Sequence, residues 1–379
     1  MIYENIVIGA GASALMFGAN IKNKSKTLIL EKNSYIGAKI LVSGGGRCNF
    51  TNKFIKSSDY LGNLEFFWPI LKEFNQNYIY SYFTKRGLKS VIKNSSQYFC
   101  QNSAKELLDI LKNECKGVNF NLNCEVLKVD KQKDIFRVYT TKGEFRAKRV
   151  VVASGGLSYP KLGASDIGYK IAKSFNHNII TTNPALVGFT LQSKEHFFKT
   201  LSGVSLEVIV KVEDKEFKNR LLFAHKGISG PAILDASLFW NKGLITIDFL
   251  PDFKMKSLQN SKKAIATLLP MPKRATKAFL ENLNIRNVAY NKLSSDEKSK
   301  LEILKSYSFA PAGTFGYTKA EVTKGGVDTT QIDSNLMSKN VKNLFFLGEL
   351  LDVTGRVGGF NFQWAFATAL KLAQFIKQS

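Results

Sequence analysis

Three glycine-rich stretches hold the residues whose types and spacing best suit chemistry on a bound nucleotide. The first, residues 6–14, is an apolar run that ends in Gly-x-Gly-x-x-Ala. Gly9 permits a tight turn, Gly11 lets a pyrophosphate approach the backbone, and Ala14 allows a helix to pack closely on a strand. The start of that helix would direct free N–H groups at the phosphates. This spacing predicts a dinucleotide-binding turn.

An acid follows the next apolar run, residues 27–30. Glu31 can accept hydrogen bonds from both hydroxyls of a ribose, and its charge would repel a 2′-phosphate, so the site favours FAD or NAD over NADP. The predicted strand, helix, second strand and acid follow one another in the order and spacing of this motif. A loop that holds glycines by chance is therefore the weaker interpretation.

The second stretch, residues 43–52, reads Ser-Gly-Gly-Gly-Arg-Cys-Asn-Phe-Thr-Asn. Three consecutive glycines permit a backbone to approach a flat or charged ligand closely. Arg47 can pair with phosphate, and Asn49, Thr51 and Asn52 offer neutral hydrogen-bond partners. Ligand contact is the favoured interpretation, and a turn without a ligand stays open as the alternative.

The third stretch, residues 354–363, follows an apolar run over residues 343–349 near the end of the chain. Another apolar run, residues 149–156, also ends in glycines. In a doubly wound sheet the carboxyl ends of the strands line the ligand crevice. We therefore expect the two ends of the chain to share one sheet, with the middle of the chain inserted between them.

Between these stretches the pattern predicts further elements. Residues 60–115 look helical and rich in aromatic side chains, which helical spacing assigns to the core rather than to base stacking. Residues 118–129 and 136–140 alternate like strands, and a hairpin turn follows. The backbone near Val126 is expected to meet an adenine. Residues 167–175 are predicted to form a helix.

From residue 184 to residue 311 the alternation of strands and helices gives way to apparent antiparallel strands. His225 lies there in Phe-Ala-His-Lys-Gly-Ile-Ser-Gly-Pro, where Pro231 suits the first turn of a helix. A turn histidine that bonds to the backbone is an equal alternative. Residues 257–307 are polar and helical, with ten Lys or Arg against four Asp or Glu. This basic face either contacts a polyanion or is merely solvated.

Composition sets the wider limits. The 379 residues include 54 Lys or Arg against 30 Asp or Glu, a formal charge of +24 that attracts polyanions or reflects a biased genome. Four cysteines form no Cys-x-x-Cys pair, and three dispersed histidines predict no metal site. The chain shows no basic leader and no apolar run long enough for a membrane span, so a cytoplasmic location is expected.

Together these motifs resemble the BaiN/YhiN-like family of FAD-dependent oxidoreductases over nearly the whole chain. The resemblance implies a Rossmann-like FAD-binding α/β domain of the glutathione-reductase type, a β-barrel-like insert and a small helical domain. The expected boundaries are residues 1–185 with 312–379, residues 186–252 and residues 253–311. The chain departs from the usual pattern at three positions, and the third leaves the substrate charge open: Ala224, Ser154 and Arg356.

The resemblance also implies where FAD would bind. Its adenosine is expected at Glu31, and its ring near residues 44–49 and 358–363. The helix that starts near Phe360 would direct its positive end at the flavin and stabilise the reduced anion. The predicted cofactor contacts are Gly9, Gly11, Ala12, Ser13, Glu31, Lys32, Lys39, Gly44, Gly45, Gly46, Arg47, Asn49, Thr51, Asn52, Val126, Ala153, Ser154, Gly155, Gly348, Glu349, Gly358, Gly359, Phe360, Asn361 and Phe362.

The predicted reaction takes a hydride from NAD(P)H into FAD and passes it to an electron-poor C=C bond, which also needs a proton donor. Cys48 is one candidate, since the cation of Arg47 would lower its thiol pKa, and a packing role is its equal alternative. His225 is the second candidate. Lys226 and Arg356 are expected to hold a charged substrate.

The substrate is the open question. The family is linked to the reduction of steroid-like enones and of a uridine in ribosomal RNA to dihydrouridine, and the positive charge favours RNA. A small-molecule enone reductase, an amine oxidase and a non-catalytic flavin-bearing RNA-binding protein remain the alternatives. The choice between NADH and NADPH and the oligomeric state stay undecided.

Overall fold

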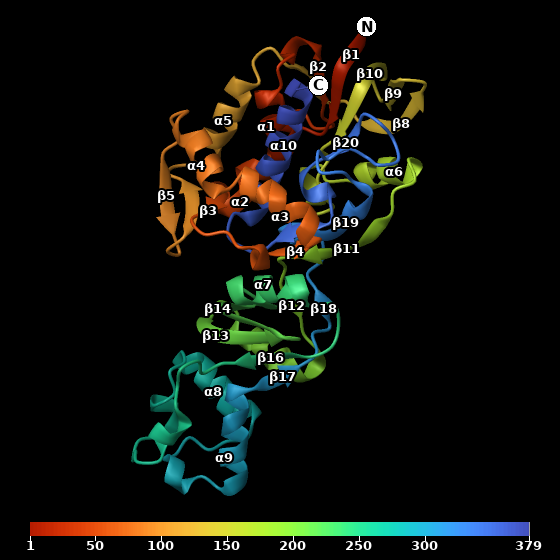
Figure 1. Ribbon diagram of the computed structural model, residues 1–379. Coiled ribbons are helices and arrows are strands. Elements are labelled where there is room, and N and C mark those ends of the chain that lie inside the picture. Colours follow the sequence, from red (N-terminus) through yellow and green to blue (C-terminus); the bar gives the residue numbers. More distant parts are fainter. Residues whose placement is uncertain (379) are drawn as a thin grey trace. The chain divides into compact units, whose positions relative to one another are not determined.

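The computed structural model describes residues 1–378. The chain divides into two units (Figure 1). Unit 1 contains residues 1–184 together with the chain from residue 322 onward, and unit 2 contains residues 185–321. The sequence therefore builds unit 1 from both of its ends, as the placement of the glycine-rich stretches predicted.

A parallel sheet forms the centre of unit 1, in the order β7, β2, β1, β10 and β20. Ile8, at the end of β1, lies between Leu30 of β2 and Val152 of β10, and Val152 in turn pairs with Phe346 of β20. The first and last predicted strands thus flank the same central strand. The strands of this sheet, with β8 and β9, are β1 Ile2–Ile8, β2 Thr27–Leu30, β7 Asn119–Asn121, β8 Val126–Gln132, β9 Ile135–Thr140, β10 Gly143–Val152 and β20 Leu344–Phe346.

Strand β10 pairs with two different strands along one of its edges. Its first half pairs antiparallel with β9, starting at Gly143 and Thr140, and its last three residues pair parallel with β20. β8 pairs antiparallel with β9 on the far side. The three strands form the meander that the sequence predicted, and it leads directly to the glycines that follow Val152.

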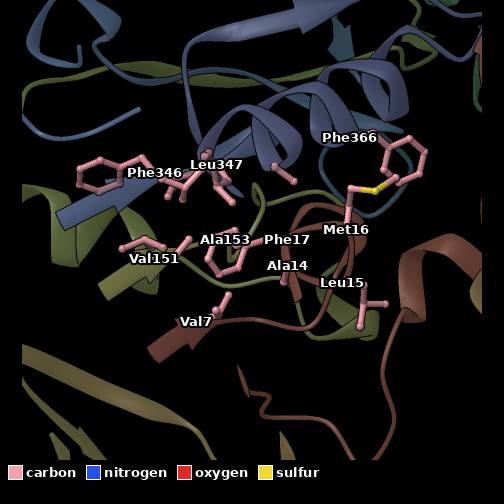
Figure 2. Packing of buried hydrophobic residues seen from close by; sticks show 14 of the residues in the cluster. Val7, Ala14, Leu15, Met16, Phe17, Val151, Ala153, Phe346, Leu347 and Phe366 are labelled. Carbon is pink, nitrogen blue, oxygen red and sulfur yellow. The ribbon is translucent and has the colours of Figure 1, made fainter. Parts of the chain in front are cut away.

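Helices α1 and α10 pack against each other beside the central strands (Figure 1). Figure 2 shows Phe17 of α1 among Val7, Ala153 and Leu347, with Phe366 of α10 beside Met16. All of these side chains are buried. This apolar contact joins the first helix of the chain to the last one. The helices of unit 1 are α1 Ala12–Asn20, α2 Ala38–Gly46, α3 Leu64–Glu73, α4 Gln76–Thr84, α5 Ala104–Glu114, α6 Ile167–Ser174 and α10 Phe360–Gln378.

Three small sheets complete unit 1. The first contains β3 Asn49–Asn52, β6 Gln97–Cys100 and β5 Ser90–Lys93. The other two are pairs: β4 Tyr60–Gly62 with β21 Val353–Gly355, and β11 Ile179–Ala185 with β19 Val322–Val327. The prediction that residues 60–115 are helical holds for α3, α4 and α5 but missed β4, β5 and β6. These strands are three or four residues long, too short for their alternation to stand out beside the helical pattern.

Unit 2 contains a seven-stranded antiparallel sheet in the order β17, β16, β13, β14, β15, β12 and β18. Pro231 begins α7 directly after Gly230, which has a φ of +90°. The elements are β12 Phe189–Thr190, β13 Ser205–Val212, β14 Lys215–Ala224, β15 Gly227–Ser229, β16 Ile245–Asp248, β17 Tyr307–Phe309, β18 Gly313–Thr314, α7 Pro231–Phe239, α8 Lys273–Asn282 and α9 Ser295–Glu302.

The residues expected to form a β-barrel-like insert and a small helical domain lie together in unit 2. The helical segment shares one hydrophobic core with the sheet. Phe279 of α8 lies 4.6 Å from Phe249, between ring centroids, and 5.7 Å from Phe198. The expected return to the first domain at residue 312 also falls later, because β18 still pairs with β12. Both parts therefore belong to unit 2, which ends at residue 321.

Candidate functional site

The turn between β1 and α1 is closed by contacts on both sides. The N–H of Gly9 donates to the carbonyl of Leu30 at 2.8 Å. Gly9 has a φ of +97°, and a Cβ there would lie 2.7 Å from the carbonyl oxygen of Ala153. A Cβ at Gly11, by contrast, would meet no atom of the surrounding protein within 4 Å. The turn is thus tight at its first glycine and open at its second.

Glu31 is held by backbone N–H groups at the end of β2. Its carboxylate accepts hydrogen bonds from the N–H of Ala10 at 2.9 Å and of Asn33 at 2.8 Å. Its own carbonyl accepts from the N–H of Cys124 at 2.9 Å. This last bond brings the chain that leads into Val126 beside the acid, where the adenosine was expected.

The triple glycine occupies left-handed backbone at the end of α2. Gly44, Gly45 and Gly46 have φ values of +56°, +66° and +80°, which side chains of L-residues rarely adopt. A Cβ at Gly44 would lie 2.9 Å from the backbone nitrogen of Asn49, whereas at Gly45 it would meet nothing within 4 Å. Arg47 follows with an exposed side chain. This turn, too, combines one packed glycine with one open glycine.

The polar residues after the triple glycine bond to the start of α10. The hydroxyl of Thr51 donates to the Gln363 side-chain oxygen at 2.7 Å, in a buried pair. The Asn52 amide donates to the carbonyl of Gly358 at 2.9 Å. The Asn49 amide oxygen accepts from the N–H of Gly359 at 3.1 Å. These side chains therefore tie the second stretch to the third.

Glu349 joins three further segments. One of its oxygens lies 2.7 Å from the ammonium of Lys39, and the other accepts from the N–H of Thr323 at 2.9 Å. A Cβ added at Gly156 would lie 3.0 Å from the same carboxylate. Next to Glu349, a Cβ at Gly348 would approach the Ser13 hydroxyl at 3.1 Å. The end of β20 thus touches the start of α1, the loop after β10 and helix α2.

Helix α10 starts directly after two glycines of positive φ. The N–H of Gln363 donates to the carbonyl of Gly359 at 3.0 Å. The Asn361 side chain bonds to both the N–H and the carbonyl of Gly355, at 2.9 and 2.8 Å. The first-turn N–H groups of a helix lack partners within it and carry partial positive charge. Phe360, Asn361 and Phe362 occupy this turn.

The residues of unit 1 fit an FAD molecule. Its pyrophosphate needs a glycine turn without side-chain cover and a helix start, and both exist at Gly11 and α1. A second uncovered glycine, Gly45, lies in the turn tied to α10. The residues expected at the ribose and in the loop after β10, Glu31 and Gly155, belong to the same unit. Lys32 has an exposed side chain 3.8 Å from Glu125.

Cys48 does not have the environment that the sequence predicted. The side chain is fully buried, and burial raises the pKa of its thiol well above the usual value. Arg47 points to solvent and does not offset this. The prediction that a neighbouring cation lowers the thiol pKa is therefore wrong. A packing role beside Cys100, which the sequence left as the alternative, fits the burial of both side chains.

The other predicted catalytic residues lie in different units. Arg356 belongs to unit 1, where its N–H donates to the Asp59 carbonyl at 3.0 Å and its guanidinium lies 3.4 Å from the Asp59 carboxylate. His225 and Lys226 form the exposed two-residue turn between β14 and β15 in unit 2. Ala224 ends β14, and Ser154 follows β10. Each site residue thus has a defined position within its own unit.

Sequence reasoning missed several residues that position the site. Gln363 lies in the third stretch, but only its pairing with Thr51 and the Phe74 carbonyl reveals its role. Thr323 bonds to Glu349 and to the N–H of Leu157. The Val-Thr-Lys-Gly-Gly-Val motif at residues 322–327 was the sequence signal for it. Among residues 1–378, no group of His, Cys, Asp and Glu is arranged to hold a metal ion. Nor does any described helix combine the length and the apolar character that crossing a bilayer requires.

Comparison with known proteins extends over nearly the full chain. The family model for the HI0933-like protein Rossmann domain matches residues 3–375. The ribosomal RNA dihydrouridine synthase of Escherichia coli K12 is 36% identical, over 98% of this chain and 97% of its own length. The Haemophilus influenzae protein of the same name is 37% identical, over 99% and 98%. The 3-dehydro-bile acid delta(4,6)-reductase of Clostridium scindens is 29% identical, over 96% of each chain.

These matches extend over both of the chain segments that build unit 1. The chain belongs to the HI0933-like Rossmann family, which confirms the predicted BaiN/YhiN-like resemblance and the assignment to the FAD-dependent oxidoreductases.

Proposed function

We propose that this chain reduces a uridine of ribosomal RNA to dihydrouridine, with FAD as its bound cofactor and a reduced nicotinamide as the source of electrons. The observation that carries the proposal is the likeness to two ribosomal RNA dihydrouridine synthases, which covers 97–98% of their length. The charge of +24 supports an anionic substrate. A cytoplasmic location follows from this substrate.

The reaction adds two hydrogens to the C5=C6 bond of uracil. This bond is conjugated with the C4 carbonyl, so a hydride adds at C6 and a proton at C5. Reduced FAD, when bound, supplies the hydride. The residues of unit 1 would position the cofactor, with Glu31 at the ribose and the turns at Gly11 and Gly45 along its length. The first turn of α10 would place positive charge beside the reduced ring.

The proton must come from a separate donor. Because Cys48 is fully buried, we assign this task to His225, whose side chain is exposed in a turn of unit 2. Lys226, beside it, would contact the RNA backbone. Arg356 would orient the substrate through its guanidinium, which is anchored on Asp59.

Expression in an E. coli strain that lacks its own ribosomal RNA dihydrouridine synthase tests the proposal. We expect mass spectrometry of the ribosomal RNA to find dihydrouridine restored by this chain and absent with a Gly11→Val variant. Ribosomal RNA that stays without dihydrouridine, although the protein is made and holds flavin, would overturn the proposal.

The second candidate is reduction of a steroid-like enone, which the likeness to the bile acid reductase favours. The same purified protein, reduced without oxygen, distinguishes the two. Re-oxidation of its flavin by a steroid enone but not by unmodified ribosomal RNA would select this alternative. Peroxide release with an amine and no nicotinamide would instead indicate an oxidase.

A further inference from the structure

One stretch of unit 2 concentrates positive charge without any acid. Residues 253–280 contain seven Lys or Arg among 28 residues and no Asp or Glu, whereas the chain as a whole has 54 among 379. The stretch is thus about twice as basic as the average, so a general compositional bias does not account for it. All six of its lysines have exposed side chains. Lys277 lies 3.7 Å from Glu281, and the other five define what we call the basic surface: Lys254, Lys256, Lys262, Lys263 and Lys273.

The backbone beneath the basic surface is fixed by buried side chains. Leu258 and Ile265 are fully buried between the lysines, and Leu269 is 5% exposed. Phe279 follows in α8, where it packs on Phe249 of the sheet core. A solvated, disordered tail would lack such anchors. The core of unit 2 therefore holds this charge in place.

The charge of the basic surface is not neutralised within the chain. Neighbouring cations of the same unit form short ion pairs, as Arg286 does with Glu297 at 2.7 Å and Lys300 with Asp296 at 2.6 Å. Across residues 1–378, by contrast, no ion pair involves a lysine of the basic surface. Its field is available to an external anion.

The side chains between these lysines indicate which anion. The stretch has no exposed large apolar residue; those of unit 2 lie elsewhere, at Leu222, Leu244 and Ile303. An amphipathic membrane-binding face presents exposed apolar side chains beside its cations, and this stretch presents none, which favours a polyanion over a lipid surface. Phe253 and Phe279 pack on the core and cannot stack on bases. What remains is contact with phosphates.

We propose that the basic surface binds the phosphate backbone of ribosomal RNA and holds the substrate while unit 1 performs the reduction. The inference rests on the proposed function and adds where the RNA is held. Contact with phosphates alone carries no sequence information. Selection of the uridine must therefore come from RNA structure and from the reactive site, and the basic surface supplies affinity that depends on salt.

The test compares two full-length variants in which five lysines become glutamine. The first changes the basic surface. The matched control changes five exposed lysines of unit 1: Lys22, Lys85, Lys112, Lys116 and Lys173. Both lose the same charge, so a general electrostatic effect lowers affinity equally. Binding to ribosomal RNA purified from a strain without the enzyme is measured between about 50 and 300 mM salt, together with flavin content and thermal midpoint.

We expect the basic-surface variant to bind ribosomal RNA roughly 10- to 100-fold more weakly at about 150 mM salt, with a shallower dependence of log Kd on log salt by about 3 to 4. The control should change by less than about threefold. Flavin content and reduction of the flavin by a nicotinamide should match the unmodified protein in both variants.

Equal losses in the two variants, or no loss in either, would overturn the inference. A basic-surface variant that loses binding to vesicles of anionic lipid rather than to RNA would also overturn it. These outcomes are distinct from failure of the proposed function. In that case the unmodified protein would form no dihydrouridine, whichever lysines bind RNA.

Discussion

The two units of this protein differ in how many separate segments of the chain build them. Unit 1 is assembled from segments about 310 residues apart, joined by polar pairs such as Thr51 with Gln363 and Lys39 with Glu349. Unit 2 is one continuous segment with a core of packed aromatic rings and, on its exterior, the five exposed lysines of the basic surface. A cofactor enclosed from several sides needs convergence of distant segments. A long polyanion needs only an exposed, rigid set of charges, which one segment can supply.

The largest expected effect comes from placing a side chain at one of the two open glycines, because this tests whether unit 1 holds the cofactor. The Cβ of a Val at Gly11 would have no surrounding protein atom within 4 Å, so the fold should survive. Its side chain would, however, occupy the place of the pyrophosphate. We expect Gly11→Val to lower FAD affinity by at least about 100-fold and to abolish activity. Flavin absorbance after purification, with far-ultraviolet circular dichroism, checks both parts.

Gly9→Ala is the matched contrast to that variant. Its Cβ would lie 2.7 Å from the Ala153 carbonyl, at a φ of +97°. This substitution should destabilise folding by about 2–4 kcal/mol, seen as a lower denaturation midpoint. Equal stability of the two variants would contradict the distinction between a packed and an open glycine.

A large effect is also expected at His225, the proposed proton donor. If His225 donates the proton, His225→Asn should slow reduction of RNA by roughly 100-fold or more, while reduction of the flavin by a nicotinamide stays unchanged. Stopped-flow measurement of the two half-reactions separates these effects. Equal slowing of both half-reactions would assign His225 a structural role instead.

Removing one bond between the second and third stretches should have an intermediate effect. Thr51→Val leaves the buried Gln363 amide oxygen without its donor, at a cost of about 1–3 kcal/mol. We expect a lower unfolding midpoint and weaker FAD binding together, because the bond links the Gly45 turn to α10. A Thr51→Ser variant, which keeps the hydroxyl, should retain most of both. FAD binding that is unchanged in Thr51→Val would separate these stretches from the cofactor.

Cys48→Ala should change turnover by less than about threefold, since the thiol is buried and its pKa is raised. Stability should fall by about 1 kcal/mol through lost packing. A loss of turnover beyond 100-fold with intact flavin binding would restore Cys48 as a proton donor.

The smallest expected effect is a pH dependence of stability in unit 1. Burial lowers the pKa of His177, which is 3% exposed and packs on Phe346. A histidine with a lowered pKa in the folded state takes up protons more readily when unfolded, so its stability contribution is present above pH 6.5 and is lost as the pH falls. Denaturant unfolding between pH 5 and 8 should show this decline, and His177→Phe should reduce it. An unchanged slope in the variant would contradict it.

Much of unit 1 could be predicted because local patterns specify it. Each of several local patterns predicts one element: the glycine spacing at Gly9 and Gly11, the acid at Glu31, and the apolar runs that form β10 and β20. The sequence could not reveal that Asn49, Thr51 and Asn52 bond to residues 358–363, because partners about 300 residues apart leave no local periodicity. It also misjudged Cys48, since an adjacent Arg47 in sequence says nothing about burial. The helical part of unit 2 looked separate because its shared aromatic core becomes visible only in three dimensions.

The stoichiometry of FAD in the purified protein tests the central claim most directly, namely that turns from both ends of the chain form one cofactor site in unit 1. We predict one FAD per chain, released on denaturation and restored on titration of the apoprotein. A folded protein that is colourless and binds no added FAD would contradict the account.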